Sequence, residues 1–501
     1  MYSKLNLWNS HSNQSIDAIM TKSIMIQGTG SNVGKSVLVA GILRALYKRG
    51  YKVAPFKPQN MSNNAAVTKD GGEIGRAQAL QAIACHLDLH TDMNPILLKP
   101  ESSTGSQVVV QGKVLTTVKG REYGTLKHRL LPQVLESFER LSSQVDIVVV
   151  EGAGSPAETN LRAGDIANMG FAQATGVPVI LTGDIDRGGV IAQVVGTHSV
   201  LPQQDRDLIK GFLINKFRGD VSLFDDGYKT ISDMTQWSGL GVIPWFDKAH
   251  LLPAEDSMDI KSGGSGQFKI VVPRLPRISN FDDLDPLKCE QNVEVLVLTQ
   301  GNAIPGDTNL VILPGSKSTI SDLAYLREQN WDQDIFAHVR RGGHVLGICG
   351  GYQMLGNTIS DPDGIEGDPS TVQGLGLLDV DTVMTPKKHL TEVNGTALDG
   401  TVEISGYEIH IGETDGPDCS RSWINIGNRS EGAQCSDGRV MGSYLHGIFA
   451  GDAFRSKYLE MQGQLPQKGL SYSDVVQTTL DDLAEHLENH MNIDQLIKLA
   501  K

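Results

Sequence analysis

The chain has 501 residues, of which 40% are hydrophobic and 20% are charged, and its formal net charge is −14 at pH 7. This length exceeds what one hydrophobic core usually organises, so we expect two or more domains. The composition is typical of a globular protein, and no apolar run approaches the roughly 18 residues that span a bilayer. The acidic charge argues against a nucleic-acid-binding surface. Composition therefore predicts neither a membrane protein nor a nucleic-acid partner.

The five cysteines are scattered and odd in number, which does not fit a disulfide framework. None forms a CxxC pair of the kind that holds structural zinc. A reducing, cytoplasmic environment fits them best. They are Cys85, Cys289, Cys349, Cys419 and Cys435.

The first residues lack the apolar segment of a signal peptide. Met1–Ile19 is polar, and Met20 stands directly before the first convincing strand. We therefore predict a disordered extension over residues 1–21, with Met20 as the natural start. Loss of activity on deletion of the residues before Met20 would contradict this hypothesis.

The first 250 residues or so alternate short apolar runs with longer helical patterns. The runs are rich in Val and Ile and are bounded by Gly, Pro or Asp, which is typical of buried strands. Residues 35–49 suit a helix packed on a sheet. Strand and helix in alternation predict parallel βαβ units with helices on both faces. The predicted strands are Ser23–Gln27, Lys52–Phe56, Val145–Val150, Val177–Thr182 and Leu208–Ile214.

A Gly- and Ser-rich stretch over residues 256–268 reads as a linker, after which a second α/β pattern begins. Ser318 or Thr319 is expected to cap a helix, and Asp361–Ser370 is expected to be a loop. The sequence thus predicts an α/β protein with two doubly wound domains, over residues 22–255 and 269–455, and a C-terminal helical extension over 456–501. The strands predicted in the second domain are Lys269–Val272, Val293–Leu298, Leu310–Leu313, His344–Ile348 and Val440–Leu445.

The segment GTGSNVGKS, residues 28–36, follows a predicted strand and opens a predicted helix, the context that a phosphate-binding loop requires. Backbone N–H groups of such a loop point at phosphate oxygens, and the helix N-terminus favours negative charge. The strict pattern has Gly where this chain has Thr29, so the loop is a variant, and a turn that binds no nucleotide is the alternative. The predicted nucleotide contacts are Gly28, Thr29, Gly30, Gly34, Lys35 and Ser36, with Lys35 on the β- and γ-phosphates and the Ser36 hydroxyl on Mg²⁺.

This loop resembles that of the dethiobiotin-synthetase-like P-loop enzymes, which transfer phosphate from ATP to a carboxylate. The resemblance implies that Lys57 lies near the substrate and the γ-phosphate, and that Glu151, at a strand end, binds Mg²⁺. Other implied contacts are less specific, and a charge-rich turn without a site role is their alternative. They are Asn215 and Lys216 on the nucleotide base, and Asp186 and Arg187 on the substrate or phosphate.

In the second half, GICGG over residues 347–351 follows an apolar run, as in a strand-to-helix nucleophile elbow. Small neighbours are needed because the turn at Cys349 is tight. Such a turn exposes the sulfur, and the N-terminus of the following helix favours the thiolate. An inert buried cysteine is the alternative, but the flanking glycines argue against it.

The elbow resembles that of the class I glutamine amidotransferases, which have a flavodoxin-like fold. Their cysteine attacks the side-chain amide of glutamine, releases ammonia and forms a thioester that water cleaves. The resemblance implies an oxyanion hole at Gly350 and Gly315 and a base at His446, with His410 as the rival. Many of these enzymes have Glu two residues after the histidine, where this chain has Ile448. The third member is therefore missing or comes from elsewhere, and we expect weak free-standing glutaminase activity.

Several long sequence segments, spread from about Lys22 to the end of the chain, resemble those of the cobyric acid synthases. This resemblance implies ATP- and glutamine-dependent amidation of the b, d, e and g carboxylates of adenosylcobyrinic acid a,c-diamide, through acyl phosphates. The implied cofactors are ATP and Mg²⁺, and the partners are the corrinoid, glutamine and ATP. The segments are PFKPQNMSN at 55–63, EGAGSPAE at 151–158, VPRLPRISNFDD at 272–283, LPGSKST at 313–319 and GYEIH at 406–410.

Three other functions stay open at this point. Cobyrinic acid a,c-diamide synthase shares both chemistries but starts from a less amidated corrin, and cytidine triphosphate synthase shares the domain order. A non-catalytic P-loop regulatory ATPase is a different class, and it leaves the cysteine elbow unexplained. The corrin-binding residues, the order of amidation, the ammonia route and homo-oligomer formation are not decided by the sequence.

Overall fold

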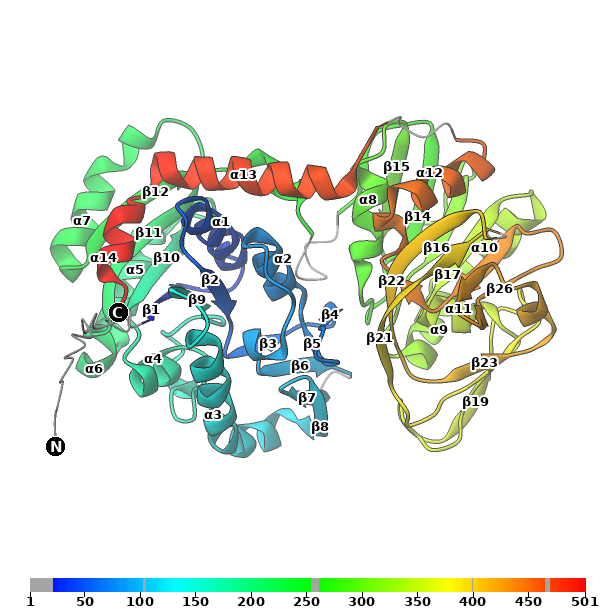
Figure 1. The fold of residues 1–501 in the computed structure, drawn as a ribbon, viewed down its shortest axis with the longest axis horizontal. Coiled ribbons are helices and arrows are strands. Elements are labelled where there is room, and N and C mark those ends of the chain that lie inside the picture. The colour runs from blue at the N-terminus through cyan, green and yellow to red at the C-terminus, as the bar shows by residue number, and fades with distance from the viewer. Residues whose placement is uncertain (1–20, 102–104, 254–260, 399, 465–468) are drawn as a thin grey trace, which may run out of the picture.

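The computed structural model describes residues 21–101, 105–253, 261–398, 400–464 and 469–501. The predicted start at Met20 and nearly all of the predicted N-terminal extension lie outside these residues, as does part of the predicted linker. Two α/β domains lie side by side (Figure 1). The predicted fold class is confirmed, because each domain is built on a largely parallel sheet with helices against it.

The N-terminal domain is built on a six-stranded parallel sheet in the order β12-β11-β10-β1-β9-β2. All five predicted strands form, with their ends shifted by at most three residues. The sixth strand, β12, was missed because Gly239 and Gly241 interrupt its apolar pattern. The strands are β1 (Lys22–Gly28), β2 (Val53–Phe56), β9 (Ile147–Glu151), β10 (Val179–Asp184), β11 (Ile209–Phe217) and β12 (Ser238–Pro244).

Helices cover both faces of this sheet, as the alternating pattern predicted (Figure 1). The phosphate-loop helix α1 (Lys35–Lys48) matches the predicted helix over residues 35–49. The other helices are α2 (Arg76–Ala84), α3 (Gly120–Ser142), α4 (Met169–Thr175), α5 (Val190–Val200), α6 (Gln203–Arg206) and α7 (Asp225–Thr235).

Two small sheets, which the sequence did not predict, lie on the side of this domain that faces the C-terminal domain (Figure 1). They begin within the PFKPQNMSN segment and take up much of the sequence between β2 and β9. One has the order β3-β6-β7-β8, and the other is the pair β4-β5. Their strands are β3 (Gln59–Met61), β4 (Ala65–Val67), β5 (Glu73–Gly75), β6 (Ile96–Pro100), β7 (Gly105–Val110) and β8 (Lys113–Lys119).

The C-terminal domain has a seven-stranded sheet in the order β13-β15-β14-β16-β17-β27-β26, with five parallel strands in the middle and an antiparallel strand at each edge. The predicted strands form here too. The predicted late strand is divided in two at Tyr444, where β27 ends and β28 (Leu445–His446) joins another sheet. The seven strands are β13 (Gly263–Gly264), β14 (Phe268–Pro273), β15 (Val293–Leu298), β16 (Leu310–Leu313), β17 (His344–Ile348), β26 (Ala433–Gln434) and β27 (Val440–Ser443).

Helix α9 begins at Thr319, as predicted, but the side chain of Ser318 does not cap it. The carboxylate of Glu366 accepts hydrogen bonds from the N–H groups of Thr319 (3.0 Å) and Ile320 (2.9 Å) instead. A carboxylate from the predicted loop Asp361–Ser370 therefore satisfies the free N–H groups at the helix start. The helices are α8 (Asp285–Lys288), α9 (Thr319–Glu328), α10 (Trp331–Arg340) and α11 (Gly350–Leu355).

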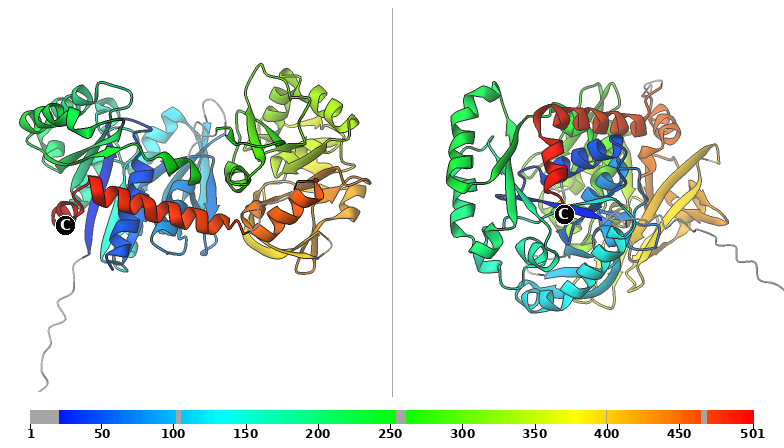
Figure 2. Two further views of the ribbon diagram at one scale, coloured as in Figure 1. Left: turned by 90° about the horizontal axis from the view of Figure 1, so that it is seen from above. Right: turned by 60° about the vertical axis from the view of Figure 1, so that its left-hand side comes forward.

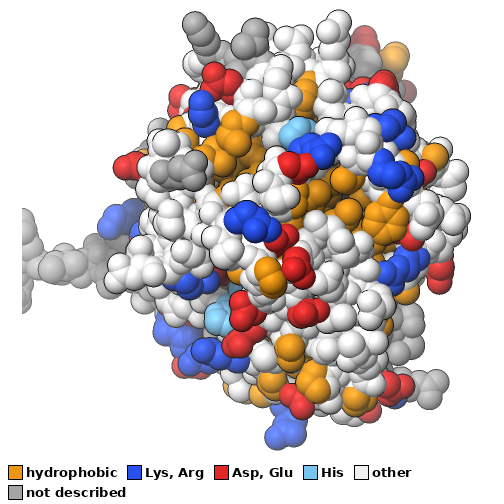
Figure 3. Space-filling view, turned by 90° about the vertical axis from the view of Figure 1, so that its right-hand side faces the viewer, with side chains coloured by type: hydrophobic (Ala, Val, Ile, Leu, Met, Phe, Trp, Pro, Cys, Tyr) orange, Lys and Arg blue, Asp and Glu red, His pale blue; other side chains and the backbone are white. Residues whose placement is uncertain are grey.

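Two further sheets complete this domain, an antiparallel one with the order β25-β24-β21-β22-β28 and a mixed one with the order β19-β18-β20-β23, in which β18 and β20 are parallel. The long hairpin of β21 and β22 carries Tyr407 and His410 toward the N-terminal domain. Figure 3 shows the outer face of the C-terminal domain, where basic and acidic side chains are interspersed and hydrophobic side chains form a broken band across the upper half of the view. The strands are β18 (Thr358–Asp361), β19 (Ser370–Gln373), β20 (Asp381–Val383), β21 (His389–Ala397), β22 (Val402–His410), β23 (Glu413–Asp415), β24 (Ile424–Ile426) and β25 (Arg429–Glu431).

The C-terminal segment is helical and returns to the N-terminal domain (Figure 2). It comprises α12 (Asp452–Met461), which the predicted boundary at residue 455 divides, then α13 (Tyr472–His490) and α14 (Ile493–Leu499). Helix α13 packs on α1 at Gly41, where a Cβ would lie 2.6 Å from Leu487 Cδ1. Arg44 pairs with Asp481 at 2.9 Å beside this contact. Within the described ranges, none of the helices combines the length and apolarity needed to cross a membrane.

Candidate active sites

The predicted phosphate loop joins β1 to α1 at the carboxyl edge of the parallel sheet. Gly34 has a φ of +93°, a left-handed conformation that glycine adopts without strain. Lys35 Nζ donates to the carbonyl oxygens of Gly30 (3.0 Å) and Gly154 (3.4 Å). A Cβ at Gly28 would lie 3.0 Å from that same Nζ. The loop therefore closes around its lysine, as a phosphate cradle requires.

Glu151 ends β9 and accepts hydrogen bonds from side chains on α1, on α2 and on the residue after β2. Its carboxylate is 1% exposed. Oε1 accepts from Lys57 Nζ (2.9 Å) and Ser36 Oγ (2.8 Å), and Oε2 accepts from Gln81 Nε2 (2.6 Å). Three predicted site residues that are far apart in the sequence thus meet. Within the described part of the chain, Gln81 Oε1 and Thr182 Oγ1 are buried without a hydrogen-bond partner.

Asn215 and Lys216, at the end of β11, lie against the phosphate loop. Asn215 Nδ2 donates to the Val33 carbonyl at 2.8 Å. Lys216 pairs with Asp184 at 2.9 Å and also donates to the Asn32 carbonyl. The structure therefore brings both predicted residues to the loop, together with an acidic residue that the sequence reading did not single out.

Asp186 and Arg187 are placed differently. Asp186 is exposed and pairs with Arg218 at 2.6 Å. Arg187 is also exposed and makes no hydrogen bond or ion pair with any residue that the structure describes. Neither side chain bonds to the Glu151 cluster, so the alternative of a charged turn without a site role stays open for them.

Cys349 lies between β17 and α11 with φ +53° and ψ −110°, a strained backbone conformation for a residue with a side chain. The flanking glycines are required by close packing. A Cβ at Gly351 would lie 2.0 Å from the Leu313 carbonyl oxygen, and one at Gly347 would lie 2.6 Å from the Gly351 carbonyl oxygen. The strand, the strained residue and the short helix form the elbow that the GICGG pattern predicted.

His446 is fully buried beside this elbow. Its Nδ1–H donates to Asp283 Oδ2 at 2.7 Å, and its Nε2 has no hydrogen-bond partner among the described residues. Burial disfavours the cationic ring, but Asp283 and Cys349 outweigh burial and raise the pKa of His446 to about 10. A Cβ at Gly315 would lie 2.8 Å from His446 Cε1, so the predicted oxyanion loop lies against the imidazole.

His410, the rival base, also lies near Cys349 but in a different environment. Its ring stacks between His389 and Tyr444, with centroids at 4.8 and 3.8 Å. Burial, followed by the charge of His389, lowers the pKa of His410 to about 3. No carboxylate among the described residues pairs with it. The geometry therefore favours His446 as the proton-transfer group.

Comparisons with known proteins match both domains. Residues 24–260 match the CobQ/CobB/MinD/ParA nucleotide binding domain, and residues 269–454 match the CobB/CobQ-like glutamine amidotransferase domain. A cobyric acid synthase of Rhodobacter capsulatus is 62% identical over 480 residues, covering 96% of this chain and 100% of its own length. Those of Ruegeria sp. and Jannaschia sp. are each 62% identical, over 95% of this chain and 98% and 99% of their own lengths.

The chain belongs to the cobyric acid synthase family. It is accordingly a glutamine-hydrolysing amidoligase of cobalamin biosynthesis, with a nucleotide-binding synthetase domain followed by a glutaminase domain.

A cavity of about 490 Å³ lies between these two domains. The glutaminase domain contributes Cys349, Gln353 and His410 to its wall, and the synthetase domain contributes Lys99 and Glu101. Cys349, the predicted nucleophile, therefore faces a cavity that the other domain helps to line. Ion pairs bridge the domains at the edge of the cavity, between Lys317 and Glu101 at 2.8 Å and between Lys388 and the buried Glu73.

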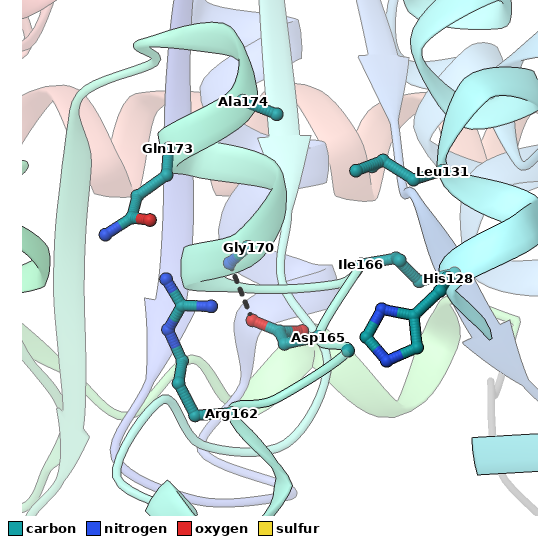
Figure 4. A pocket seen from close by; sticks show the side chains of 9 residues that line it. His128, Leu131, Arg162, Asp165, Ile166, Gly170, Gln173 and Ala174 are labelled. Atoms are coloured by element: carbon teal, nitrogen blue, oxygen red, sulfur yellow. Dashed lines mark hydrogen bonds between the residues drawn. The ribbon is translucent and has the colours of Figure 1, made fainter. Parts of the chain in front are cut away.

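A second hollow, of about 410 Å³, lies in the synthetase domain between α3 and α4 (Figure 4). His128 and Arg162 line it. Asp165 accepts a hydrogen bond from the Gly170 N–H at 2.8 Å, which holds the start of α4. No predicted site residue lines this hollow, and its arginine is already paired with Asp205 at 2.7 Å.

Three residues at the candidate sites, Asp283, Gln81 and Asp184, were not predicted from the sequence. Asp283 ends the VPRLPRISNFDD word, which was noticed as a family signal, but nothing in that word indicated a histidine partner. It lies 163 positions before His446. Gln81 and Asp184 carry no motif of their own, and only the fold shows which carboxylate or lysine they reach.

Proposed function

We propose that the protein amidates the b, d, e and g carboxylates of adenosylcobyrinic acid a,c-diamide to give adenosylcobyric acid, using ATP, Mg²⁺ and glutamine. The substrate follows from the family, whose curated members are 62% identical over almost the whole chain. One observation above all supports ammonia release in one domain and amidation in the other. This observation is the cavity that Cys349 shares with the synthetase domain. The five cysteines are all free, which supports a reducing, cytoplasmic location.

In the glutaminase half, Cys349 Sγ attacks the side-chain amide carbon of glutamine. The N–H groups of Gly350 and Gly315 are the proposed donors to the developing oxyanion. His446 is largely cationic near neutral pH, because its pKa is raised to about 10, and it can protonate the departing nitrogen as ammonia. Water then cleaves the thioester with His446 as the base, which releases glutamate and restores the starting pair of a Cys349 thiolate and a protonated imidazole. Asp283 fixes the imidazole orientation throughout.

In the synthetase half, the loop at residues 28–36 and Lys35 hold the β- and γ-phosphates of ATP. Lys57 lies where it can orient the carboxylate toward the γ-phosphate, since its Nζ is 2.9 Å from Glu151. The activated carboxylate is an acyl phosphate, which ammonia attacks to give the amide and release phosphate. An acyl phosphate is needed because a free carboxylate is a poor electrophile.

The residues of the Glu151 cluster fit Mg²⁺. Ser36 Oγ and Glu151 Oε1 are hard oxygen donors 2.8 Å apart, and the buried Oε1 of Gln81, whose Nε2 donates to Glu151, lacks a partner within the described residues. We propose Ser36 and Glu151 as ligands. When bound there, Mg²⁺ would neutralise phosphate charge that these side chains cannot offset.

The test is to incubate the protein with ATP, Mg²⁺, glutamine and adenosylcobyrinic acid a,c-diamide and to follow product mass. We expect four stepwise amidations. The Cys349→Ala variant should lose them with glutamine and keep them with ammonium, because only the nitrogen source is removed. Amidation of the precursor without the a,c-amides, but not of the diamide, would assign the protein to cobyrinic acid a,c-diamide synthase instead. No amidation of either corrin would overturn the proposal.

A further inference from the structure

Helix α2 of the synthetase domain touches both candidate sites. Near its middle, Gln81 donates to Glu151 at 2.6 Å, and Gln78 approaches the same carboxylate oxygen at 3.5 Å. At its first residue, Arg76 pairs with Asp282 of the glutaminase domain at 2.9 Å. A single nine-residue helix therefore spans from the proposed metal ligand to the neighbourhood of the glutaminase base.

Arg76 is held on the glutaminase side by more than one bond. Besides Asp282, its Nη2 donates to the Tyr407 hydroxyl at 2.6 Å, and its guanidinium lies 5.4 Å from the centre of the Tyr407 ring. The same Nη2 donates to the Ala65 carbonyl of its own domain at 2.9 Å. The side chains of Arg76 and Asp282 are only 15% and 12% exposed, so solvent screens this ion pair poorly.

Both partners of Arg76 adjoin the base. Asp282 precedes Asp283, which holds His446 Nδ1. The Tyr407 ring stacks on the His446 ring, with centroids 5.4 Å apart and planes inclined by 18°. Arg76 thus fixes the residue next to the histidine's carboxylate and the ring that covers its face. It also offsets the charge of two adjacent buried carboxylates, which would otherwise repel each other.

Hydrogen bonds and close packing hold the start of α2 against the synthetase site. The Gly75 N–H donates to Asn94 Oδ1 at 3.1 Å, and Asn94 Nδ2 donates to the carbonyl of Lys57 at 3.1 Å. Asn60 packs so closely that a Cβ at Gly75 would lie 2.2 Å from its Nδ2. Because Gln81 and Arg76 lie on one short, closely packed helix, we expect a shift at Glu151 to displace Arg76 as well.

We propose that Arg76 is a positioning residue of the glutaminase, supplied by the synthetase domain, and that α2 ties its position to Glu151. The part concerning Glu151 rests on the proposed function. The consequence is that glutamine hydrolysis responds to ligands at the synthetase site. A free glutaminase would waste glutamine, whereas this connection favours ammonia release when an acceptor is bound.

The test measures glutamate release by the full-length protein with glutamine alone and with ATP, Mg²⁺ and adenosylcobyrinic acid a,c-diamide added. In Arg76→Met we expect kcat to fall about tenfold or more with little change in KM for glutamine, because the base and not the glutamine pocket is disturbed. The ratio of the rates with and without the added ligands should fall toward one. Arg76→Lys keeps the positive charge but loses the planar set of guanidinium donors. It should restore part of kcat and part of the response to the added ligands.

Two controls separate positioning from folding. Arg49→Met is a matched loss of an arginine that pairs with two acidic residues, Glu488 and Asp494, and it should leave both rates unchanged. Ammonium-dependent amidation by Arg76→Met should stay within about twofold, because the synthetase site is untouched. If Arg76→Met does not fold, Asp282→Asn removes the same ion pair at constant size and should show the same loss.

A ligand response that stays at the wild-type ratio in a folded Arg76 or Asp282 variant would overturn the inference. So would parallel losses of glutamine- and ammonium-dependent activity, which indicate a structural role only. Failure of the proposed function is distinguishable, because it would appear in the wild type as absent corrin amidation. Glutamate release without any corrin would still show whether Arg76 positions the base.

Discussion

The two sites of this protein differ in what their side chains do before a substrate arrives. In the glutaminase domain, the proposed catalytic residues Cys349, His446 and Asp283 are already placed together, with one imidazole nitrogen bonded and the other without a partner in the described residues. In the synthetase domain, the charged groups pair with one another, and Glu151 holds Lys57 and Ser36. A site that reacts through its own sulfur is preassembled. A site that handles phosphates keeps its charges paired until the ligand takes their place.

Breaking the synthetase cluster should have the largest effect on amidation. In Glu151→Gln the carboxylate is lost at nearly constant size, so we expect amidation with either glutamine or ammonium to fall at least about hundredfold. Basal glutamate release should stay within about threefold, because Gln can still accept from Gln81 and keep α2 in place. Product mass and glutamate release measured on the same preparation check both expectations. An equal fall in the two activities would show that the sites are not separable.

A change in the proposed glutaminase triad should reduce amidation with glutamine and leave amidation with ammonium unchanged. Asp283→Asn leaves a neutral partner for His446 Nδ1, and the ring loses both its fixed orientation and the charge that favours the imidazolium. We expect glutamine-dependent amidation to fall about tenfold to a thousandfold, less than in Cys349→Ala. Amidation with ammonium should be unchanged. Retained glutaminase activity would mean that the histidine needs no carboxylate, which is one of the two alternatives left open by the absence of Glu at position 448.

The same comparison explains which residues the sequence could reveal. The phosphate loop lies within nine consecutive residues and the elbow within five, so local patterns identified both. The third triad member could not be found in this way, because Asp283 and His446 meet only when β28 pairs with the hairpin strand β22 beside the turn after β14. The position at which many class I glutamine amidotransferases have Glu is taken by Ile448, which is 1% exposed and packs in the core.

The fold was predictable where the apolar pattern of an element shows which layer of the domain it belongs to. Val- and Ile-rich runs in parallel strands gave both central sheets. The docking of α13 was not predictable, because its apolar side could cover either domain. Only the structure shows Leu487 against Gly41 of α1, far from the domain that precedes it in the chain. The small sheets that carry Ala65 and Arg76 to the glutaminase were also missed, since their strands have three to seven residues and weak alternation.

The smallest effect expected is a pH dependence of stability that belongs to the glutaminase site. The pKa of His446 is raised from 6.5 to about 10, so the stability gained from its bond with Asp283 is fully present below about pH 6.5 and is lost as the pH rises toward 10. In Asp283→Asn that gain is absent. The difference in melting temperature between the wild type and the variant should therefore narrow between pH 6.5 and pH 10.

Thermal unfolding across this range checks the expectation, with the His446→Gln background as the control. There the same Asp283→Asn change should give a difference that no longer depends on pH, because the titrating group has been removed. A gap of constant size in the wild-type background would mean that the imidazole is neutral in the folded protein. The proton for the departing ammonia would then have to come from the Cys349 thiol through His446. The glutaminase residues would in that case be correctly placed, but the imidazole would become cationic only during the reaction.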